Sequence, residues 1–285
     1  MLFLFQAEPA SPPNFEYVFI TLILGGMVWF ILRRVSIYFE KLYALIHKKP
    51  IFLNTIIYSD SLTKTQLRII ETDFLFYSKL SHKDKKTFRH RVSRFISDKV
   101  FIGREGIEPT VEMKTMIAST AIMLTFGFRK YLIDIVETVI IYPKSYYSQI
   151  NNAFHKGETN PQLKAIVFSW EDFKKGYKIG DDNLNLGIHE FGHAIHLNAA
   201  KNSDVSSLIF NQGFKKLTDY LQNHKVIREN LIASKYFRAY AFTNHYEVFA
   251  VLLENFIETP LEFKSQFPEL YKYMQQMLNF KFTGY

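Results

Sequence analysis

The feature that most restricts how this 285-residue chain can fold is an uncharged apolar run near its start. From Tyr17 to Leu32 the sequence reads YVFITLILGGMVWFIL, sixteen residues without a charge, and Arg33 and Arg34 follow at once. As an α-helix this run rises about 24 Å at 1.5 Å per residue, and Phe15 and the two arginines extend it toward the roughly 30 Å of a bilayer core. A run that is apolar on every side predicts a single transmembrane helix rather than a buried core helix.

The charges around the run predict an uncleaved anchor and its orientation. A secretory signal peptide carries basic residues before its apolar segment, whereas here the only charged side chains before the run are Glu8 and Glu16. Since the basic residues follow the run, the positive-inside rule places the N-terminus outside and the rest in the cytoplasm. We therefore expect an N-terminal segment with a transmembrane anchor (1–35), a juxtamembrane linker (36–60) and a domain (61–285) on the cytoplasmic side of the inner membrane.

Composition restricts the chemistry of that domain. The chain has no cysteine, which excludes disulfides, thiolate ligands and a cysteine nucleophile, so a metal must be held by His, Asp or Glu. Hydrophobic residues make up 48% of the chain and charged residues 22%, as in ordinary globular proteins with a large core. The formal net charge of +8 suits nucleic acid, an anionic membrane surface or simply a basic cytoplasmic protein.

Local patterns predict an α+β domain that is mostly helical with a small sheet. Thr138–Tyr142 and Ala165–Ser169 are rich in β-branched and aromatic residues and predict two strands. After Asp182 the pattern is helical to about Phe280. The apolar run Thr115–Phe128 has the length of a buried core helix, so we do not count it as a second span.

A basic amphipathic helix is predicted to start at Ser81, which forms a capping box with Asp84 and places Phe88, Val92 and Phe95 on one face. We interpret the other face as solvated, lying near an anionic bilayer because the anchor holds it there. Nucleic acid is not expected as a partner, since no recognition motif accompanies the charge. The basic residues assigned to this face are Lys83, Lys85, Lys86, Arg89, Arg91 and Arg94.

The segment LGIHEFGHAIH, residues 186–196, carries the chemistry. Helical residues four apart share a face, so His189 and His193 can bind one ion. Glu190 lies beside them, where a carboxylate can take a proton from water activated by zinc. The alternative is a pair of buried histidines, but the apolar residues of this helix occupy other faces, which favours the metal.

A catalytic zinc site needs a third protein ligand. The metzincin pattern HExxHxxGxxH fails here, because His196 and Ala199 stand at its glycine and last histidine. In NHYEVFAVLLENFIETP, Glu247, Glu254 and Glu258 lie on a strongly apolar helix, where a carboxylate is expensive to bury unless it meets a cation. Spacing leaves open which glutamate binds the metal and which supports a histidine.

Several longer stretches accompany these residues between about Phe76 and about Tyr273: FYSKLS, FIGREGIEPTVEMK, IIYP, VFSWEDF, HEFGH and YAFTNHYEVFAVLLENFIETP. With them the chain resembles the Mlc titration factor A family of zinc-dependent peptidases. The resemblance implies a gluzincin-like, zincin-type fold in nearly the whole cytoplasmic domain. The transmembrane anchor departs from the soluble members of that family.

The resemblance also implies roles for five residues. It assigns Zn2+ to His189, His193 and Glu247, which selects one of the three glutamates left open by spacing. Glu190 would act as general base. Tyr240 matches a family tyrosine that stabilises the negative oxygen of the tetrahedral intermediate.

Three further expectations concern the surroundings of the metal. AIVFS at 165–169 is expected to be the edge strand along which an extended peptide pairs. The polar segment Asn151–Pro161 is expected to be a mobile loop over the metal. His196 stands where the family usually has Asp, and it is expected to be a surface histidine or an additional weak ligand.

Together these features predict a membrane-anchored zinc peptidase, aminopeptidase-like by the resemblance, acting on peptides or unstructured ends of proteins. The alternative is a regulatory binding module that sequesters a transcriptional repressor or another partner protein, since the family is named for binding a repressor. Glu190 and Tyr240 favour catalysis, because a purely structural zinc is normally closed by four protein ligands and needs neither.

Overall fold

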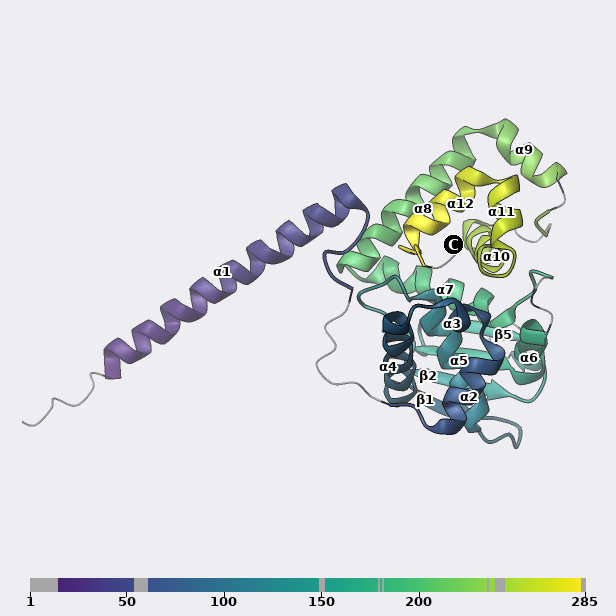
Figure 1. Cartoon of the computed structure of the whole chain (residues 1–285), viewed down its shortest axis with the longest axis horizontal. Coiled ribbons are helices and arrows are strands. Elements are labelled where there is room, and N and C mark those ends of the chain that lie inside the picture. Colours follow the sequence, from purple (N-terminus) through teal and green to yellow (C-terminus); the bar gives the residue numbers. More distant parts are fainter. Residues whose placement is uncertain are drawn as a thin grey trace, which may run out of the picture.

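The fold is described here from a computed structural model, which places residues 15–53, 61–148, 152–178, 180, 182–234, 236–238 and 244–282. Helix α1 (Phe15–His47) projects away from the rest of the chain as one long rod (Figure 1). Every residue from Phe15 to Phe39 is exposed. In the described part of the chain α1 is the one helix long and apolar enough to cross a membrane, and it contains the predicted span.

The end of α1 packs on the domain through α8 (Val205–Asn223). Ala44 is fully buried in a cluster with Val205 and Ile209, and Lys48 Nζ donates a hydrogen bond to Gln212 Oε1 at 2.9 Å. Because α1 continues without a break across the predicted boundary between residues 35 and 36, the predicted anchor and the segment that packs on α8 belong to one helix. The division of the chain at residues 35 and 60 stays a prediction.

Helices surround a small sheet, which confirms the predicted mostly helical α+β fold. They form a lower group around the sheet and an upper group above α7 (Figure 1). The remaining helices are α2 (Lys64–Asp73), α3 (Leu75–Lys79), α4 (His82–Asp98), α5 (Val111–Leu124), α6 (Trp170–Lys178), α7 (Leu186–Lys201), α9 (Lys225–Ala233), α10 (His245–Glu258), α11 (Pro260–Gln266) and α12 (Pro268–Met277).

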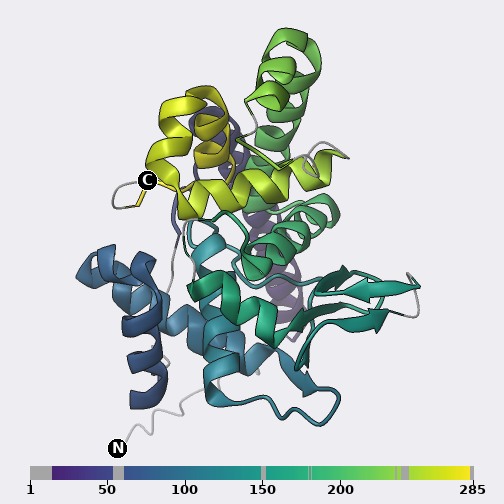
Figure 2. The ribbon, with the colours of Figure 1, turned by 90° about the vertical axis from the view of Figure 1, so that its right-hand side faces the viewer.

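The main sheet has the strand order β1-β2-β6-β5. Strands β1 (Val100–Gly103), β2 (Thr138–Tyr142) and β6 (Ala165–Ser169) are parallel, and β5 (Gly157–Asn160) is antiparallel to β6. The bounds of β2 and β6 are those predicted from the sequence. A separate antiparallel hairpin joins β3 (Tyr146–Ser148) to β4 (Ala153–His155); these teal strands reach out to one side of the domain in Figure 2.

Two expectations about the strands are wrong. Strand β6 is not an edge strand, because β2 and β5 pair with it on both sides, and all five of its residues are buried, as is usual for an interior strand. The polar segment Asn151–Pro161 is not a loop throughout, since it supplies β4 and β5. The edge strand of the main sheet on this side is therefore β5.

The core lies between the sheet and α7 and contains α5. The predicted core segment Thr115–Phe128 is buried throughout, which confirms its place in the core. Phe191 of α7 packs against Phe168 of β6, with ring centroids 5.5 Å apart. Gly192 faces α10, where a Cβ would lie 3.2 Å from Leu253 Cδ2, so the Leu253 side chain would have to move by a few tenths of an ångström.

Helix α4 begins as predicted, with Ser81 capping its first turn, and its apolar face is fully buried. Arg91 was assigned to the solvated face, and that assignment is wrong, because its side chain is only 1% exposed. The guanidinium donates hydrogen bonds to the carbonyls of Phe126 and Phe128, both at 2.9 Å. These carbonyls follow the end of α5, where backbone acceptors lack partners within the helix.

Candidate metal centre

Helix α7 holds the two histidines one above the other. Its N-cap is Asn185, whose side-chain oxygen accepts a hydrogen bond from the Ile188 backbone N–H at 3.1 Å. A cap of this kind satisfies a donor that the first helical turn leaves free. The helix then carries His189 and His193 on one face, with ring centroids 4.7 Å apart.

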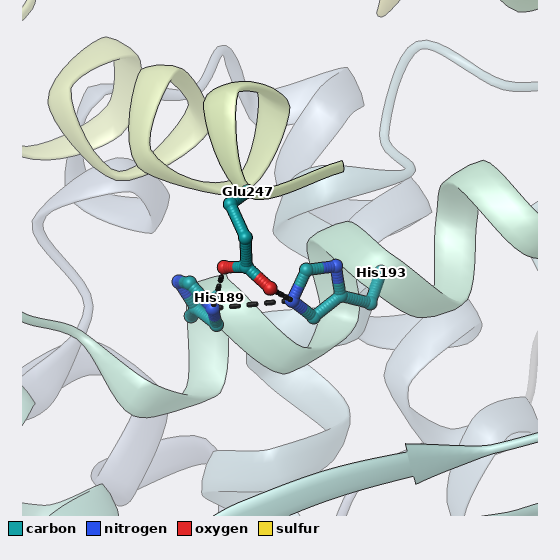
Figure 3. Close-up of side chains that lie close together, drawn as sticks. All are labelled: His189, His193 and Glu247. Atoms are coloured by element: carbon teal, nitrogen blue, oxygen red, sulfur yellow. Dashed lines mark hydrogen bonds and ion pairs between the residues drawn. The ribbon is translucent and has the colours of Figure 1, made fainter. Parts of the chain in front are cut away.

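Helix α10 brings Glu247 to the same point. Asn244 caps this helix by accepting hydrogen bonds from the backbone N–H groups of Tyr246 and Glu247. Glu247 therefore lies in the first turn, and its carboxylate points from α10 toward the two imidazoles (Figure 3). Its Oε2 is 3.2 Å from His189 Nε2, and its Oε1 is 3.4 Å from His193 Nε2.

The three side chains fit a divalent ion. The two Nε2 atoms are 3.1 Å apart, and the ligand atoms of all three residues lie within 4.8 Å of one another. Ligands about 2.0–2.1 Å from a tetrahedral zinc are separated by roughly 3.3 Å, which is close to the observed spacings. We call His189, His193 and Glu247 the candidate metal centre.

Glu254 orients His189 from behind. It is 1% exposed, and its Oε1 lies 2.7 Å from His189 Nδ1 and 2.6 Å from Arg238 Nη2. Its Oε2 accepts a hydrogen bond from the Asn185 backbone N–H at 3.0 Å. Because Nδ1 of His189 donates to Glu254, Nε2 is the ring nitrogen that faces Glu247 and His193 and remains to bind an ion. Sequence reasoning missed Arg238, since a buried carboxylate requires a cation but no local pattern says which one.

The pKa values show that this centre attracts positive charge. Burial lowers the pKa of His189, but hydrogen bonds to Glu247 and Glu254 outweigh it and raise that pKa to about 9. Burial and the charge of His189 lower the pKa of His193. Without an ion, one proton is thus held on His189, where a metal would compete with it.

Glu190 lies between the candidate metal centre and the edge strand β5. The Thr159 hydroxyl is 2.9 Å from the Glu190 backbone oxygen and 3.1 Å from its Oε2. Burial raises the pKa of Glu190 to about 7, although the charge of His189 and the Thr159 hydrogen bond oppose this. A carboxyl group with such a pKa can accept and return a proton near neutral pH.

Gly157 of β5 makes room for Glu190. A Cβ at this position would lie 2.7 Å from Glu190 Cγ and 2.8 Å from Leu186 Cδ1, distances that require something to shift. The absence of a side chain therefore lets the edge strand pass close to α7. Sequence reasoning did not single out this glycine.

His196 is neither a member of the candidate metal centre nor a surface residue. It is 8% exposed, so the expected surface position is wrong, and its ring packs against Phe214 and Tyr246 with centroids 4.3 and 4.7 Å apart. Its buried Nδ1 has no hydrogen-bond partner, and burial lowers its pKa to about 4. His196 is thus a neutral ring joining α7, α8 and α10. Tyr240, the expected oxyanion donor, lies outside the described residues.

Cavities open on both sides of the candidate metal centre. One, of about 260 Å³, is lined by Thr159, His193, His196, Asn244, Tyr246 and Glu247. The other, of about 380 Å³, includes Phe154, Gly157, Leu184, His189, Glu190 and Arg238 in its lining. The two cavities therefore reach the candidate metal centre and Glu190, and each is lined by a residue of β5, Thr159 in one and Gly157 in the other.

Two comparisons with known proteins show what the chain is similar to. Over 217 residues the chain is 22% identical to the uncharacterized protein slr2042 of Synechocystis sp., covering 70% of this chain and 78% of that protein. Residues 49–279 match the family described as "Glucose-regulated metallo-peptidase M90", and this match includes both histidines, Glu190 and Glu247. The predicted resemblance to the titration factor family of peptidases is thereby confirmed, and the chain belongs to the M90 family of metallopeptidases.

Proposed function

We propose that this protein is a membrane-anchored zinc peptidase that hydrolyses peptide bonds in peptides or unstructured protein ends. The observation that carries the proposal is the convergence of two imidazole nitrogens and one carboxylate at tetrahedral spacing, with Glu190 next to them. Membership of a metallopeptidase family supports peptides as substrates.

Each side chain has a role in this reaction. Zinc on His189, His193 and Glu247 would supply a Lewis acid that polarises a carbonyl and lowers the pKa of water to about 7. Glu190 accepts the proton of the attacking water and later gives it to the leaving amine, a task that its raised pKa suits. By the family resemblance, Tyr240 donates a hydrogen bond to the developing negative oxygen.

The substrate would lie along β5. An extended peptide that adds to a sheet edge gains backbone hydrogen bonds whatever its sequence, and β5 has β6 on one side only. Thr159 and Gly157 of this strand both contact Glu190, so a peptide held there would pass the general base. The cavities on both sides of the metal would then receive side chains of the substrate.

The apolar part of α1 would anchor the enzyme. Its exposed side chains from Tyr17 to Leu32 cannot be covered by the domain, since only the end of the helix packs on α8. Arg33 and Arg34 favour a cytoplasmic position for the domain. Strand β5 lies on the side of the domain opposite to α1 (Figure 1), so the site would open toward the cytoplasm rather than the bilayer.

The test uses the full chain in lipid nanodiscs. We expect Glu190→Gln to keep bound zinc and to lose about a hundredfold or more in peptide hydrolysis. Glu262→Gln, a change at an exposed glutamate of α11, serves as the control. Equal hydrolysis by the wild type and Glu190→Gln would reject catalysis and leave the regulatory binding role. Comparing peptides with free and acetylated N-termini separates aminopeptidase from endopeptidase action.

A further inference from the structure

Helix α4 carries a row of basic side chains on the face that it turns away from the core. These side chains follow one another at intervals of three or four residues, so they share one face of the helix. Lys83, Lys86 and Arg94 are exposed, and His90 between them is half-buried. We call these four residues the α4 stripe.

The acidic residues of α4 lie off this stripe and have partners of their own. The Ser81 hydroxyl donates a hydrogen bond to Asp84 Oδ2 at 2.6 Å, and Asp98 Oδ2 is 2.8 Å from Lys99 Nζ. Among the residues that the structure describes, none forms an ion pair or a hydrogen bond with the side chain of Lys83 or Lys86. These two lysines therefore present their charges to the surroundings.

Exposed apolar side chains lie next to α4. Arg91 Nη2 donates a hydrogen bond to the Leu53 backbone oxygen at 3.4 Å, which brings the segment after α1 against this helix. In that segment Ile51 is 53% exposed and Phe52 is 44% exposed. Apolar side chains beside basic ones are typical of surfaces that enter the headgroup layer of a bilayer, where apolar burial and attraction to anionic lipids add.

The α4 stripe faces the side of the domain from which α1 projects. The buried face of α4 packs on α5, and in Figure 1 α5 and α1 lie on opposite sides of α4. Figure 2 views the domain from the other side and shows α1 behind it. Because the stripe lies opposite the buried face, it is turned toward the apolar part of α1, and so is the segment that follows α1 (Figure 1).

We propose that the α4 stripe and residues 51–53 dock the domain on the surface of the bilayer by binding anionic lipid headgroups. Lys83 and Lys86 meet the negative headgroups, and Ile51 and Phe52 enter the headgroup layer. This docking goes beyond the proposed anchoring by α1, on which it rests, and it involves no step of hydrolysis.

Charge selects anionic lipids over zwitterionic ones. Each Lys or Arg close to an anionic bilayer strengthens binding about fivefold, and the attraction extends over about 8 Å at physiological ionic strength. Nucleic acid also attracts lysines through its phosphates. However, the exposed Ile51 and Phe52 suit the partly apolar headgroup layer better than a phosphodiester backbone.

The absence of cysteine from the chain allows a test with a single dye. Ser97, an exposed residue of α4, is changed to cysteine in the full chain and labelled, and the nanodiscs carry an acceptor dye on lipid headgroups. Single-molecule energy transfer then gives the ratio of docked to undocked domains. We expect this ratio to be higher with phosphatidylserine than with phosphatidylcholine alone, and to fall as salt is added. A dye at Ser265 of α11, far from α1 in Figure 1, should report neither change.

Matched variants tie docking to the proposed surface. Lys83→Gln with Lys86→Gln should lower the ratio of docked to undocked domains about 25-fold, at about fivefold for each lysine. Lys225→Gln with Lys272→Gln removes the same charge from exposed positions of α9 and α12 and should match the wild type. Phe52→Ser should also lower the ratio, but it should leave the salt dependence unchanged, because it removes apolar burial and no charge.

Three results would overturn the proposal. The first is equal energy transfer from Ser97 in both lipids, and the second is an unchanged ratio after loss of Lys83 and Lys86. The third is binding of a DNA duplex in phosphatidylcholine nanodiscs that the same two changes abolish, which would assign the stripe to nucleic acid. A chain that does not enter nanodiscs would refute the anchor before any transfer is measured. Since no measurement involves hydrolysis, a failure here is distinct from a failure of the proposed peptidase activity.

Discussion

Replacing Glu254 with glutamine tests how the candidate metal centre is held together. Three donors meet on this carboxylate, from His189 Nδ1, Arg238 Nη2 and the Asn185 backbone. Glutamine offers one oxygen and one amino group, so at least one of these donors would face another donor. A buried donor without an acceptor costs about 1–3 kcal/mol.

The expected loss of zinc affinity depends on pH. Removing a partner that orients a metal-binding histidine typically costs about 10–100-fold in affinity, or about 1.4–2.7 kcal/mol. However, Glu254 also helps to raise the pKa of His189, and without it a proton competes less with zinc. At pH 7 the poorer orientation of His189 weakens zinc binding, while the reduced competition from the proton partly restores it. At pH 9 and above the proton competes weakly in both proteins, so the full loss of zinc affinity is measured.

The assay is a titration with chelator-buffered zinc at pH 7 and pH 9 on the full chain. We expect Glu254→Gln to weaken zinc binding about 10–100-fold at pH 9 and by a smaller factor at pH 7. Glu262→Gln should match the wild type at both values. A Kd within about twofold of the wild type at pH 9 would show that Glu254 does not support the ligand.

Three other outcomes follow from the geometry. Gly157→Ala should keep zinc but lower kcat/KM about tenfold or more, because its Cβ would displace Glu190; an unchanged rate would contradict this. Zinc binding at pH 7.5 should release about one proton from His189, whose pKa is raised to about 9. The affinity for zinc should therefore rise as the pH rises toward 9. Calorimetry in buffers of different ionisation enthalpy would count the released proton. Ala44→Asp should expose the end of α1 to hydrogen exchange, since it puts a charge in a buried contact, whereas Ile46→Asp at an exposed position should not.

The parts of the site that the sequence predicted are those set by helical geometry. His189, Glu190 and His193 are neighbours on one helix, so their spacing suffices to place them. Glu247 comes from a distant helix, and only the family resemblance separated it from Glu254. The structure shows the physical difference: Glu247 faces the imidazole nitrogens, and Glu254 lies behind one of them.

The strands show where local patterns fail. The two interior strands β2 and β6 are apolar enough to be predicted with their bounds, but β5 consists of GETN and has no such pattern. Which strand forms the edge of the sheet depends on how distant segments pair, and the local sequence of one strand does not reveal that pairing. Arg91 was wrongly assigned to the solvated face for a related reason. The carbonyl groups that accept its hydrogen bonds lie more than thirty residues away in the sequence.

The unbroken course of α1 has a mechanical consequence for an anchored enzyme. A disordered linker would let the domain move through a wide range of distances from the bilayer. A continuous helix that packs on α8 would hold the domain at a nearly fixed distance instead. From Leu32 to Ala44 this helix measures about 18 Å. With α1 as the proposed anchor, rotation of the helix about its axis would carry the candidate metal centre around the helix at a constant distance from the bilayer, and protein ends that extend to that distance would meet it.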